Sequence, residues 1–296
     1  GNGASCPGVL AFPGRPASGF AHRMGNSECH ACGDEAAAAE VGSDVGPSFA
    51  GERPQKRPPC TLSSGAVYVG EWVGNCRHGR GEQSWPDGAM YSGEWRFDKV
   101  EGEGRFVHAD GDIYDGEWVD DTAHGFGTYH HADGSRYEGQ WAEDRQHGRG
   151  IETWPDGARF TGEYKCGRKN GRGQFWWADG CFYDGDFFDS EIQGEGLYQW
   201  IDGRRYEGSW QSNRMHGRGF CTWIDGRSYE GEYRADQKHG HGVFRWPDGR
   251  QYEGQWKDGV QHGDGVYTTA SGERRAVQWA NGRLLCSLDD GLAKPT

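Results

Sequence analysis

A repeat of fixed length dominates the chain from residue 68 onward. An aromatic residue returns every 23 positions, and a glycine follows it two residues later each time. The nine units begin at Tyr68, Tyr91, Tyr114, Tyr137, Phe160, Tyr183, Tyr206, Tyr229 and Tyr252, and no insertion interrupts the period. Short repeats of constant length are typical of stacked architectures, in which each unit contacts only its neighbours.

Each unit has the pattern of two short strands joined by turns. Most units open with Tyr-x-Gly-(Glu/Gln)-Trp. Since side chains alternate faces along a strand, Tyr68, Gly70 and Trp72 should share one face, and Val69 and Glu71 the other. The glycine leaves room for aromatic rings to lie on the backbone. Turn formers, suited to positive φ or to capping their own backbone, then follow at Asn75, Asp98, Asp121, Asp144, Gly167, Ser190, Asn213, Asp236 and Gly259.

The second half of each unit predicts another strand and a second turn. It begins with Gly-x-Gly, places aromatics on alternate positions in most units, and usually closes with Asp-Gly, a strong hairpin signal. The sequence therefore predicts an all-β fold: an elongated, twisted, single-layer antiparallel meander of nine β-hairpins. Eighteen strands about 4.8 Å apart would extend roughly 85 Å. Half-units at 62–66 and 277–282 should cap the two ends.

These motifs in combination resemble a known repeat. Tyr-x-Gly-Glu-Trp, His-Gly-x-Gly and Asp-Gly on a 23-residue period are similar to the MORN repeat (membrane occupation and recognition nexus), over all nine units. The departures are Glu101, Asn170 and Gln193 for histidine, Phe160 for the first tyrosine, Tyr164, Phe187 and Tyr233 for tryptophan, and Ser209 and Ser271 at acidic positions. The resemblance implies a scaffold of the kind found in ciliary radial spokes, protist cytoskeletal assemblies and membrane tethers.

Composition divides the chain into three parts. Residues 1–60 are rich in Gly, Ala, Pro and Ser without a period, which predicts a disordered leader. Residues 61–286 form the array, and 287–296 form a short tail. Residues 1–27 contain arginines and no acid, so part of a plastid transit peptide is one hypothesis for the start of the leader.

A second hypothesis for the leader is lipidation. Met24 precedes Gly25, and N-myristoylation of Gly25 would put Cys29 and Cys32 beside it as acylation sites. The motif expects Ser or Thr where Cys29 stands, so the match is partial. An unmodified leader is the alternative. Cys29 and Cys32 also form a single CxxC pair, whereas a zinc site usually needs two such pairs.

Charge and chemistry argue against several classes of function. The formal net charge of −13 makes nonspecific nucleic-acid binding unfavourable. Nine irregularly spaced cysteines, an odd number, indicate a reducing, intracellular and cytoplasmic setting. The recurring histidines lie on alternate strands, roughly 9.6 Å apart, which is too far to share a metal ion, so we expect them to hydrogen-bond locally. The acids that follow the first glycine should bond to turn amides or pair across the strands. We therefore expect no enzyme activity and no cofactor.

The sequence favours binding of a protein partner along the aromatic face of the sheet. Units five and six (160–205) depart together from the common pattern, so the predicted site comprises Trp176, Trp177, Phe187, Phe188 and Trp200. The alternatives are a phospholipid-binding or lipid-anchored module, and the regulatory array of a phosphatidylinositol-phosphate kinase-like enzyme, whose plant members carry such repeats. Cilium, cytoskeleton and membrane surfaces are the candidate locations. A homodimer through the C-terminal edge strand near Val277–Trp279 is a further hypothesis.

Overall fold

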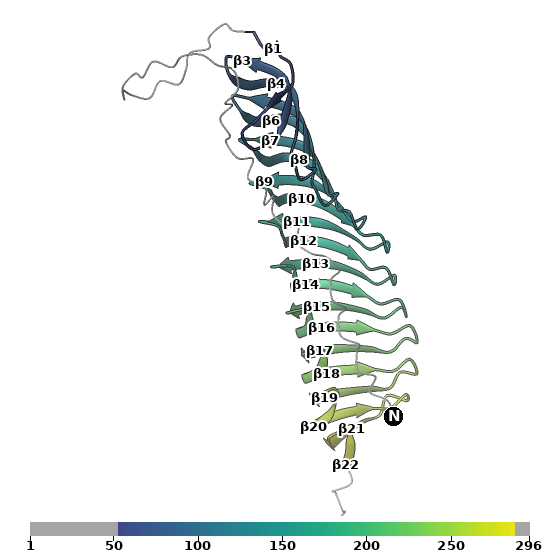
Figure 1. The fold of residues 1–296 in the computed structure, drawn as a ribbon. Coiled ribbons are helices and arrows are strands. Elements are labelled where there is room, and N and C mark those ends of the chain that lie inside the picture. The colour runs from purple at the N-terminus through teal and green to yellow at the C-terminus, as the bar shows by residue number, and fades with distance from the viewer. Residues whose placement is uncertain (1–52, 288–296) are drawn as a thin grey trace, which may run out of the picture. The chain divides into compact units, whose positions relative to one another are not determined.

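The computed structural model describes residues 53–287, and all regular structure there is β-strand (Figure 1). The described residues contain 22 strands, which confirms the predicted all-β antiparallel meander. They divide into two compact units: the first body (53–155 with 164–167) and the second body (156–163 with 168–287). Each is described by itself. The candidate lipidation sites Gly25, Cys29 and Cys32, the transit-peptide hypothesis and all but the first residue of the tail lie outside the described residues.

The strands of a unit are seven and nine residues long. The first body contains β1 (Gln55–Lys56), β2 (Cys60–Thr61), β3 (Val67–Val73), β4 (Cys76–Ser84), β5 (Met90–Arg96), β6 (Lys99–Val107), β7 (Ile113–Val119), β8 (Thr122–His130), β9 (Arg136–Ala142) and β10 (Arg145–Thr153). β11 (Arg159–Lys165) contributes to both bodies. The second body continues with β12 (Arg168–Trp176), β13 (Phe182–Phe188), β14 (Glu191–Gln199), β15 (Arg205–Gln211), β16 (Arg214–Thr222), β17 (Ser228–Arg234), β18 (Gln237–Arg245), β19 (Gln251–Lys257), β20 (Val260–Thr268), β21 (Arg274–Ala280) and β22 (Arg283–Ser287).

The two strands of a unit are joined by a two-residue turn. In the second unit Phe97 and Asp98 have φ of 48° and 69°, and positive φ at both central residues defines a type I′ turn, whose twist suits a hairpin. Asp98 also donates its N–H to the Arg77 carbonyl and accepts the Arg77 N–H on its carboxylate, at 3.0 and 2.9 Å. This pair of bonds, here called the turn clamp, joins residues 21 positions apart.

The turn clamp corrects one expectation. The side chain at this turn position bonds to the backbone of the preceding unit rather than to its own. Asp121, Asp144, Ser190, Asn213 and Asp236 accept backbone N–H groups in the same way, also from residues 21 positions earlier. Once hairpins stack, the turn of the preceding unit is nearer than the residue's own flanking backbone.

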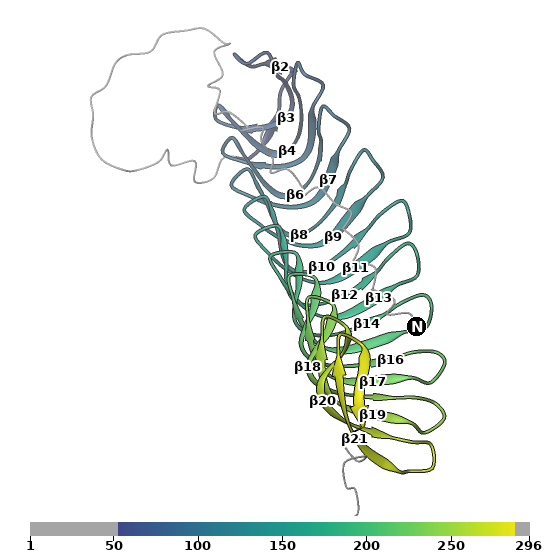
Figure 2. The same ribbon diagram turned by 90° about the horizontal axis from the view of Figure 1, so that it is seen from below.

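Successive units are joined by five-residue loops, which lie at the opposite ends of the strands from the two-residue turns (Figure 2). In the first of these, the N–H of Trp85 donates to Ala89 O and the N–H of Gly88 to Trp85 O, at 2.9 and 3.0 Å. Leu62 repeats the pattern with Ala66 and Gly65, so residues 62–66 adopt the loop geometry of a half-unit. Paired strand structure begins before residue 61, because β1 pairs with β3.

The second strand of each unit contains a β-bulge at its first glycine. On β3 and β4, Gly70 pairs with Gly81 and Trp72 with Arg77, so the intervening residues are out of register. Gly79 lies in this bulge with φ of 67°. The Glu71 carboxylate accepts the N–H of Arg80 at 3.1 Å. The same bond recurs at Glu117, Gln140, Asp186 and Glu232. This column therefore bonds across the strands to an amide of the bulge, and not to a turn amide.

The core of the array is its aromatic face, the side of the sheet that carries the Tyr, Phe and Trp columns. Tyr91 is fully buried, and its hydroxyl donates to Glu94 O at 3.0 Å. Its ring covers the backbone of Gly93 and Gly104, where an added Cβ would overlap the Tyr91 hydroxyl. Trp95, 3% exposed, meets the Tyr91 ring edge-on at 5.2 Å. Burying each such side chain contributes about 1.5–3 kcal/mol, so these rings are the principal source of packing in the array.

Candidate partner-binding site

Two of the predicted site residues belong to the aromatic core. Phe187 is 3% exposed and packs edge-on against Phe160 and Tyr183, with ring centroids 5.1 and 5.2 Å apart. Trp177 is 6% exposed, and its ring lies 4.4 Å from that of Phe175. These side chains are used for packing within the array and leave little surface for another molecule.

Trp176 and Phe188 lie on the other side of the sheet, here called the opposite face. Strand alternation along β13 puts Phe182 and Phe188 on this face, one at each end of the strand. Trp176 is half-buried, pairs directly with Phe182, and has its ring 5.1 Å from the Phe182 ring. Arg159 holds its guanidinium 5.5 Å from the Trp176 ring, and Phe188 is 64% exposed. Trp176, Phe182, Phe188 and Arg159 form the opposite-face aromatic patch.

The aromatic pair in this patch has no counterpart elsewhere in the described array. The equivalent cross-strand pairs are Ser84 with Met90, Val107 with Ile113, His130 with Arg136, Gln199 with Arg205, Thr222 with Ser228 and Arg245 with Gln251. Sequence reasoning found Trp176 but missed Phe182 and Arg159. The available signal was an aromatic residue immediately before Tyr183, at a position that is aliphatic or polar in other units.

Trp200 occupies a loop at the edge of the second body. It is half-buried, its ring lies 4.6 Å from that of Tyr198, and the Arg204 guanidinium is 4.8 Å from it. Beside it, Ile201 is 73% exposed, and Ile224 of the next loop is 84% exposed. The sequence reasoning also missed these two isoleucines. Other units have proline or alanine at this loop position, so the larger side chains were a visible signal.

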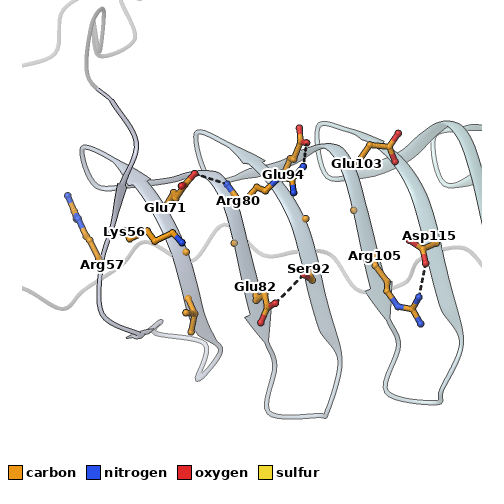
Figure 3. Close-up of a pocket in the computed structure, with 15 residues that line it drawn as sticks. Lys56, Arg57, Glu71, Arg80, Glu82, Ser92, Glu94, Glu103, Arg105 and Asp115 are labelled. Carbon is orange, nitrogen blue, oxygen red and sulfur yellow. Dashed lines mark hydrogen bonds and ion pairs between the residues drawn. The ribbon is translucent and has the colours of Figure 1, made fainter.

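A polar groove of about 740 Å³ crosses the opposite face of the first body (Figure 3). Its charged lining residues are Lys56, Arg57, Arg80 and Arg105, with the carboxylates Glu71, Glu82, Glu94, Glu103 and Asp115. Much of this charge is paired within the groove: Arg105 lies 2.8 Å from Asp115, and Arg80 lies 3.8 Å from Glu94. Because both signs are interspersed, the groove offers no strong field to a ligand of one charge.

Among the described residues that line the groove, no hydroxyl or thiol is paired with a histidine. Its one hydroxyl side chain, Ser92, donates to Glu82 at 3.4 Å, and none of the described lining residues is histidine or cysteine. Nowhere in residues 53–287 do three or more His, Cys, Asp or Glu side chains come together as metal ligands would. In the same residues, no helix is long and apolar enough to span a membrane.

The histidine column is not uniform. His262 accepts the N–H of Asn281 on Nδ1 at 3.3 Å, as expected for a local hydrogen bond. In the described structure the Nδ1 atoms of His78 and His239 are buried without a hydrogen-bond partner. Glu101 and Gln193, which stand in place of histidine in this column, accept the N–H groups of Asp120 and Ser212. The expectation therefore holds at His262 but not at the other two.

Burial also shifts the titration of the turn clamp. Desolvation raises the pKa of the Asp121, Asp144 and Asp236 carboxyls, although the N–H that each accepts opposes this. On the aromatic face, burial raises the pKa of Tyr252 to about 12, so its hydroxyl remains a donor at neutral pH. These shifted groups serve the packing of the array, and none belongs to a nucleophile–base pair.

The fold and its surfaces define a class: stacked β-hairpins with a shared aromatic core and an opposite face of variable chemistry. The MORN repeat model matches residues 68–90, 91–113, 114–136, 137–159, 160–182, 183–204, 206–226, 229–249 and 252–274. These matches cover more than half of the chain, so it belongs to the MORN-repeat family. None of the curated proteins matches the sequence.

Several solved structures resemble the chain weakly. The TCP10 domain of Danio rerio CPAP, in complex with a peptide of Danio rerio STIL, is 10% identical, with a TM-score of 0.42 over 79% of this chain and 98% of that one. The TCP domain of Drosophila melanogaster SAS-4, in complex with a proline-rich motif of Ana2, is 12% identical, with a TM-score of 0.31 over 73% and 99%. Virginiamycin B lyase from Staphylococcus aureus is 14% identical, with a TM-score of 0.15 over 78% of this chain and 72% of that one. Likenesses of this size do not bear on function.

Proposed function

We propose that this chain is a non-catalytic scaffold that binds a protein partner, in a ciliary, cytoskeletal or membrane-tethering assembly inside the cell. The observation that carries the proposal is the opposite-face aromatic patch. Trp176, Phe182 and Phe188 are not part of the aromatic core, and Phe188 is 64% exposed. Large exposed aromatics that the fold does not require are typical of interaction sites.

The partner contacts the opposite face rather than the aromatic face expected from the sequence. Binding through the aromatic columns would need their rings to be accessible, but Tyr183 is fully buried and Trp210 is 3% exposed. Their surface is already consumed by neighbouring units. The opposite-face patch offers two aromatic anchors, and a guanidinium that is already oriented against one of them, at little cost in side-chain entropy.

The test is a double substitution, Trp176→Ser with Phe188→Ser, in the full chain. Capture of the partner from native cells should fall strongly, while the melting temperature should hardly change because both side chains lie outside the core. Phe126→Ser is the matched control, since Phe126 is 53% exposed on the opposite face of the first body. Unchanged capture by the double variant would remove the patch from the proposal, and a large fall in melting temperature would place these residues in the core.

A phospholipid surface is a second candidate, favoured by the loop edge of the second body. Ile201 and Ile224 are the most exposed large apolar side chains described, and tryptophans and arginines flank them in the same loops. Apolar tips with neighbouring Trp and Arg suit the interface of a bilayer. Ile201→Ser with Ile224→Ser should abolish co-sedimentation with anionic liposomes if this edge binds lipid. Retained sedimentation would exclude that edge, and loss only on removal of residues 1–60 would instead indicate an anchor on the leader.

Two further hypotheses from the sequence stay proposals. The strand near Val277–Trp279 is not the edge expected from the sequence, because β22 pairs with it. A homodimer would therefore form through the edge of β22, which exposes Leu284 and Leu285 by 54% and 60%. Sedimentation of the full chain and of a chain ending at Arg274 tests this, and a monomeric full chain at high concentration would exclude it. A regulatory array of a phosphatidylinositol-phosphate kinase-like enzyme would require a catalytic domain on the same polypeptide, which sequencing of the full transcript tests.

A further inference from the structure

One row of side chains on the opposite face of the second body alternates between acidic and apolar residues. The first strand of each of the last four units contributes an acid: Asp184, Glu207, Glu230 and Glu253. The second strand contributes an apolar residue: Leu197, Phe220, Val243 and Val266. Consecutive members are direct cross-strand partners from β13 to β20, which makes the series continuous. We call this series the acid–apolar row.

The acids of the row are accessible and only weakly held. Arg205 lies 3.9 Å from Glu207, and Arg245 lies 3.2 Å from Glu230, while the two carboxylate side chains are 69% and 62% exposed. Exposed pairs of this kind contribute little to stability. Asp184 accepts a hydrogen bond from an amide, that of Gln174 at 2.9 Å. A cationic ligand can therefore engage these acids without breaking a strong interaction.

We propose that the acid–apolar row binds a partner segment in the polyproline II conformation that carries Arg or Lys at every third residue. The proposal rests on the proposed scaffold function and names the chemistry of the partner. Successive acids are two strands apart, roughly 9.6 Å. One turn of a polyproline II helix contains three residues and rises about 9.3 Å. Over four acids the two periods differ by about 1 Å in total, which is within the reach of a flexible Arg or Lys side chain.

Other backbone conformations fit the spacing less well. In a β-strand every third residue points alternately to opposite sides, so successive cations could not all face the row. Seven residues of an α-helix rise about 10.5 Å, and the mismatch with the acids would grow to nearly 3 Å across the row. Only the three-residue turn of polyproline II returns a side chain to the same side at this interval.

The apolar members occupy the positions between the acids. A residue pair that separates two cations of the ligand would straddle Leu197, Phe220 or Val243, halfway along each interval. Proline rings are suited to this place, because they favour polyproline II and pack well on aromatic and aliphatic side chains. Phe220 is 41% exposed and offers the largest such surface in the row. The net charge of −13 also attracts a basic segment.

The test uses the full chain and two synthetic peptides with equal numbers of arginines. One repeats Arg-Pro-Pro, and the other repeats Arg-Pro-Pro-Pro, which moves the cations out of step with the acids. Fluorescence anisotropy should show tighter binding of the triplet peptide, by about five- to tenfold, because the mismatched peptide loses charge pairs. Equal affinities would mean that the net charge alone attracts arginine, and no binding would mean that the row is not a site. Either result overturns the proposal.

Charge-neutral variants locate the binding. Glu207→Gln with Glu230→Gln should weaken the triplet peptide by about five- to tenfold. Glu82→Gln with Glu138→Gln is the matched control, because it makes the same change in net charge at the equivalent row of the first body. If both double variants weaken binding equally, the row is not the site. The melting temperature of each variant confirms that the fold is intact.

The scaffold proposal is separable from this one. If Trp176→Ser with Phe188→Ser abolishes capture of the native partner but Glu207→Gln with Glu230→Gln does not affect it, the scaffold function stands and the row is excluded as its site. If the triplet peptide binds the row and none of these variants affects native capture, the row binds polyproline II segments while the proposed patch fails.

Discussion

The same row of the opposite face has different chemistry in the two bodies. In the first body it runs through Val69, Glu82, Ser92, Arg105, Asp115, Thr128, Glu138 and Ile151. Arg105 and Asp115 neutralise each other across the strands at 2.8 Å. In the second body acids and apolar residues alternate from β13 onward, and the arginines lie one row away. The geometry is shared while the surface is not, so specificity between partners should come from this face.

The aromatic face shows the opposite behaviour, because the two bodies repeat the same contacts there. Trp141 donates Nε1–H to Gly127 O at 3.1 Å, and Trp210 donates to Gly196 O at the same distance. Each tryptophan is 3% exposed and packs edge-on against the tyrosine that opens its unit. A common core with variable surfaces predicts a gradient of mutational effects from one face to the other.

The largest effect should come from the core, and it should be equal in both bodies. Trp141→Ala and Trp210→Ala each remove a buried ring and should cost about 3–5 kcal/mol in the free energy of unfolding. Urea denaturation followed by circular dichroism measures both. A loss below about 1 kcal/mol for either variant would show that its ring is not part of the core. Unequal losses would show that the cores of the two bodies are not equivalent.

The turn clamp should give an intermediate effect. Asp144→Ala and Asp236→Ala leave the N–H groups of Ala123 and Met215 without their acceptors, and each should cost about 1–2 kcal/mol. Asp144→Asn keeps the acceptor and removes a half-buried charge. Asn213 already fills this place in another unit, with a bond of 2.7 Å, so Asn should be tolerated at 144.

The pH dependence of the Asn variant has a definite sign. Burial raises the pKa of the Asp144 carboxyl, so the folded chain holds this proton more tightly than the unfolded chain does. The resulting stabilisation is complete below the unfolded pKa, about 4, and is lost as pH rises through the folded pKa. Asp144→Asn should therefore gain stability relative to the native chain between about pH 3 and pH 7. Thermal melts across that range measure it, and a gain that grows toward acid would contradict the assignment.

The smallest effect on stability should come from the opposite face. Phe220→Thr gives the second body the residue that the first body has at this position, Thr128. Because Phe220 is 41% exposed, the free energy of unfolding should fall by less than about 1 kcal/mol. Affinity for the Arg-Pro-Pro peptide should fall. Thr128→Phe should not raise it, because the acids on either side of Thr128 are already ion-paired: Asp115 with Arg105 at 2.8 Å and Glu138 with Arg136 at 2.7 Å. A rise with Thr128→Phe would show that an exposed phenyl ring alone suffices.

The period and the alternation within each unit were enough to predict the strands and their shared core. Tyr68, Gly70 and Trp72 could be placed on one face from spacing alone, because local geometry dictates it. The turn clamp was missed, since Asp98 bonds to Arg77, and residues 21 positions apart become neighbours only after the hairpins stack. The patch was half found: Trp176 stood out in the sequence, but its contact with Phe182 depends on the cross-strand register.

The turn clamp also determines how this chain can change in length. From Asp98 onward, each hairpin turn of the array bonds to the backbone of the unit before it. Removing or adding a few residues between a donor and its acceptor would change their separation of 21 positions and break the clamp that spans the change. Loss or duplication of a full 23-residue unit keeps this spacing, so the acceptor at the new junction still meets a backbone N–H of the unit before it. The array should therefore tolerate insertions and deletions best when they comprise whole 23-residue units.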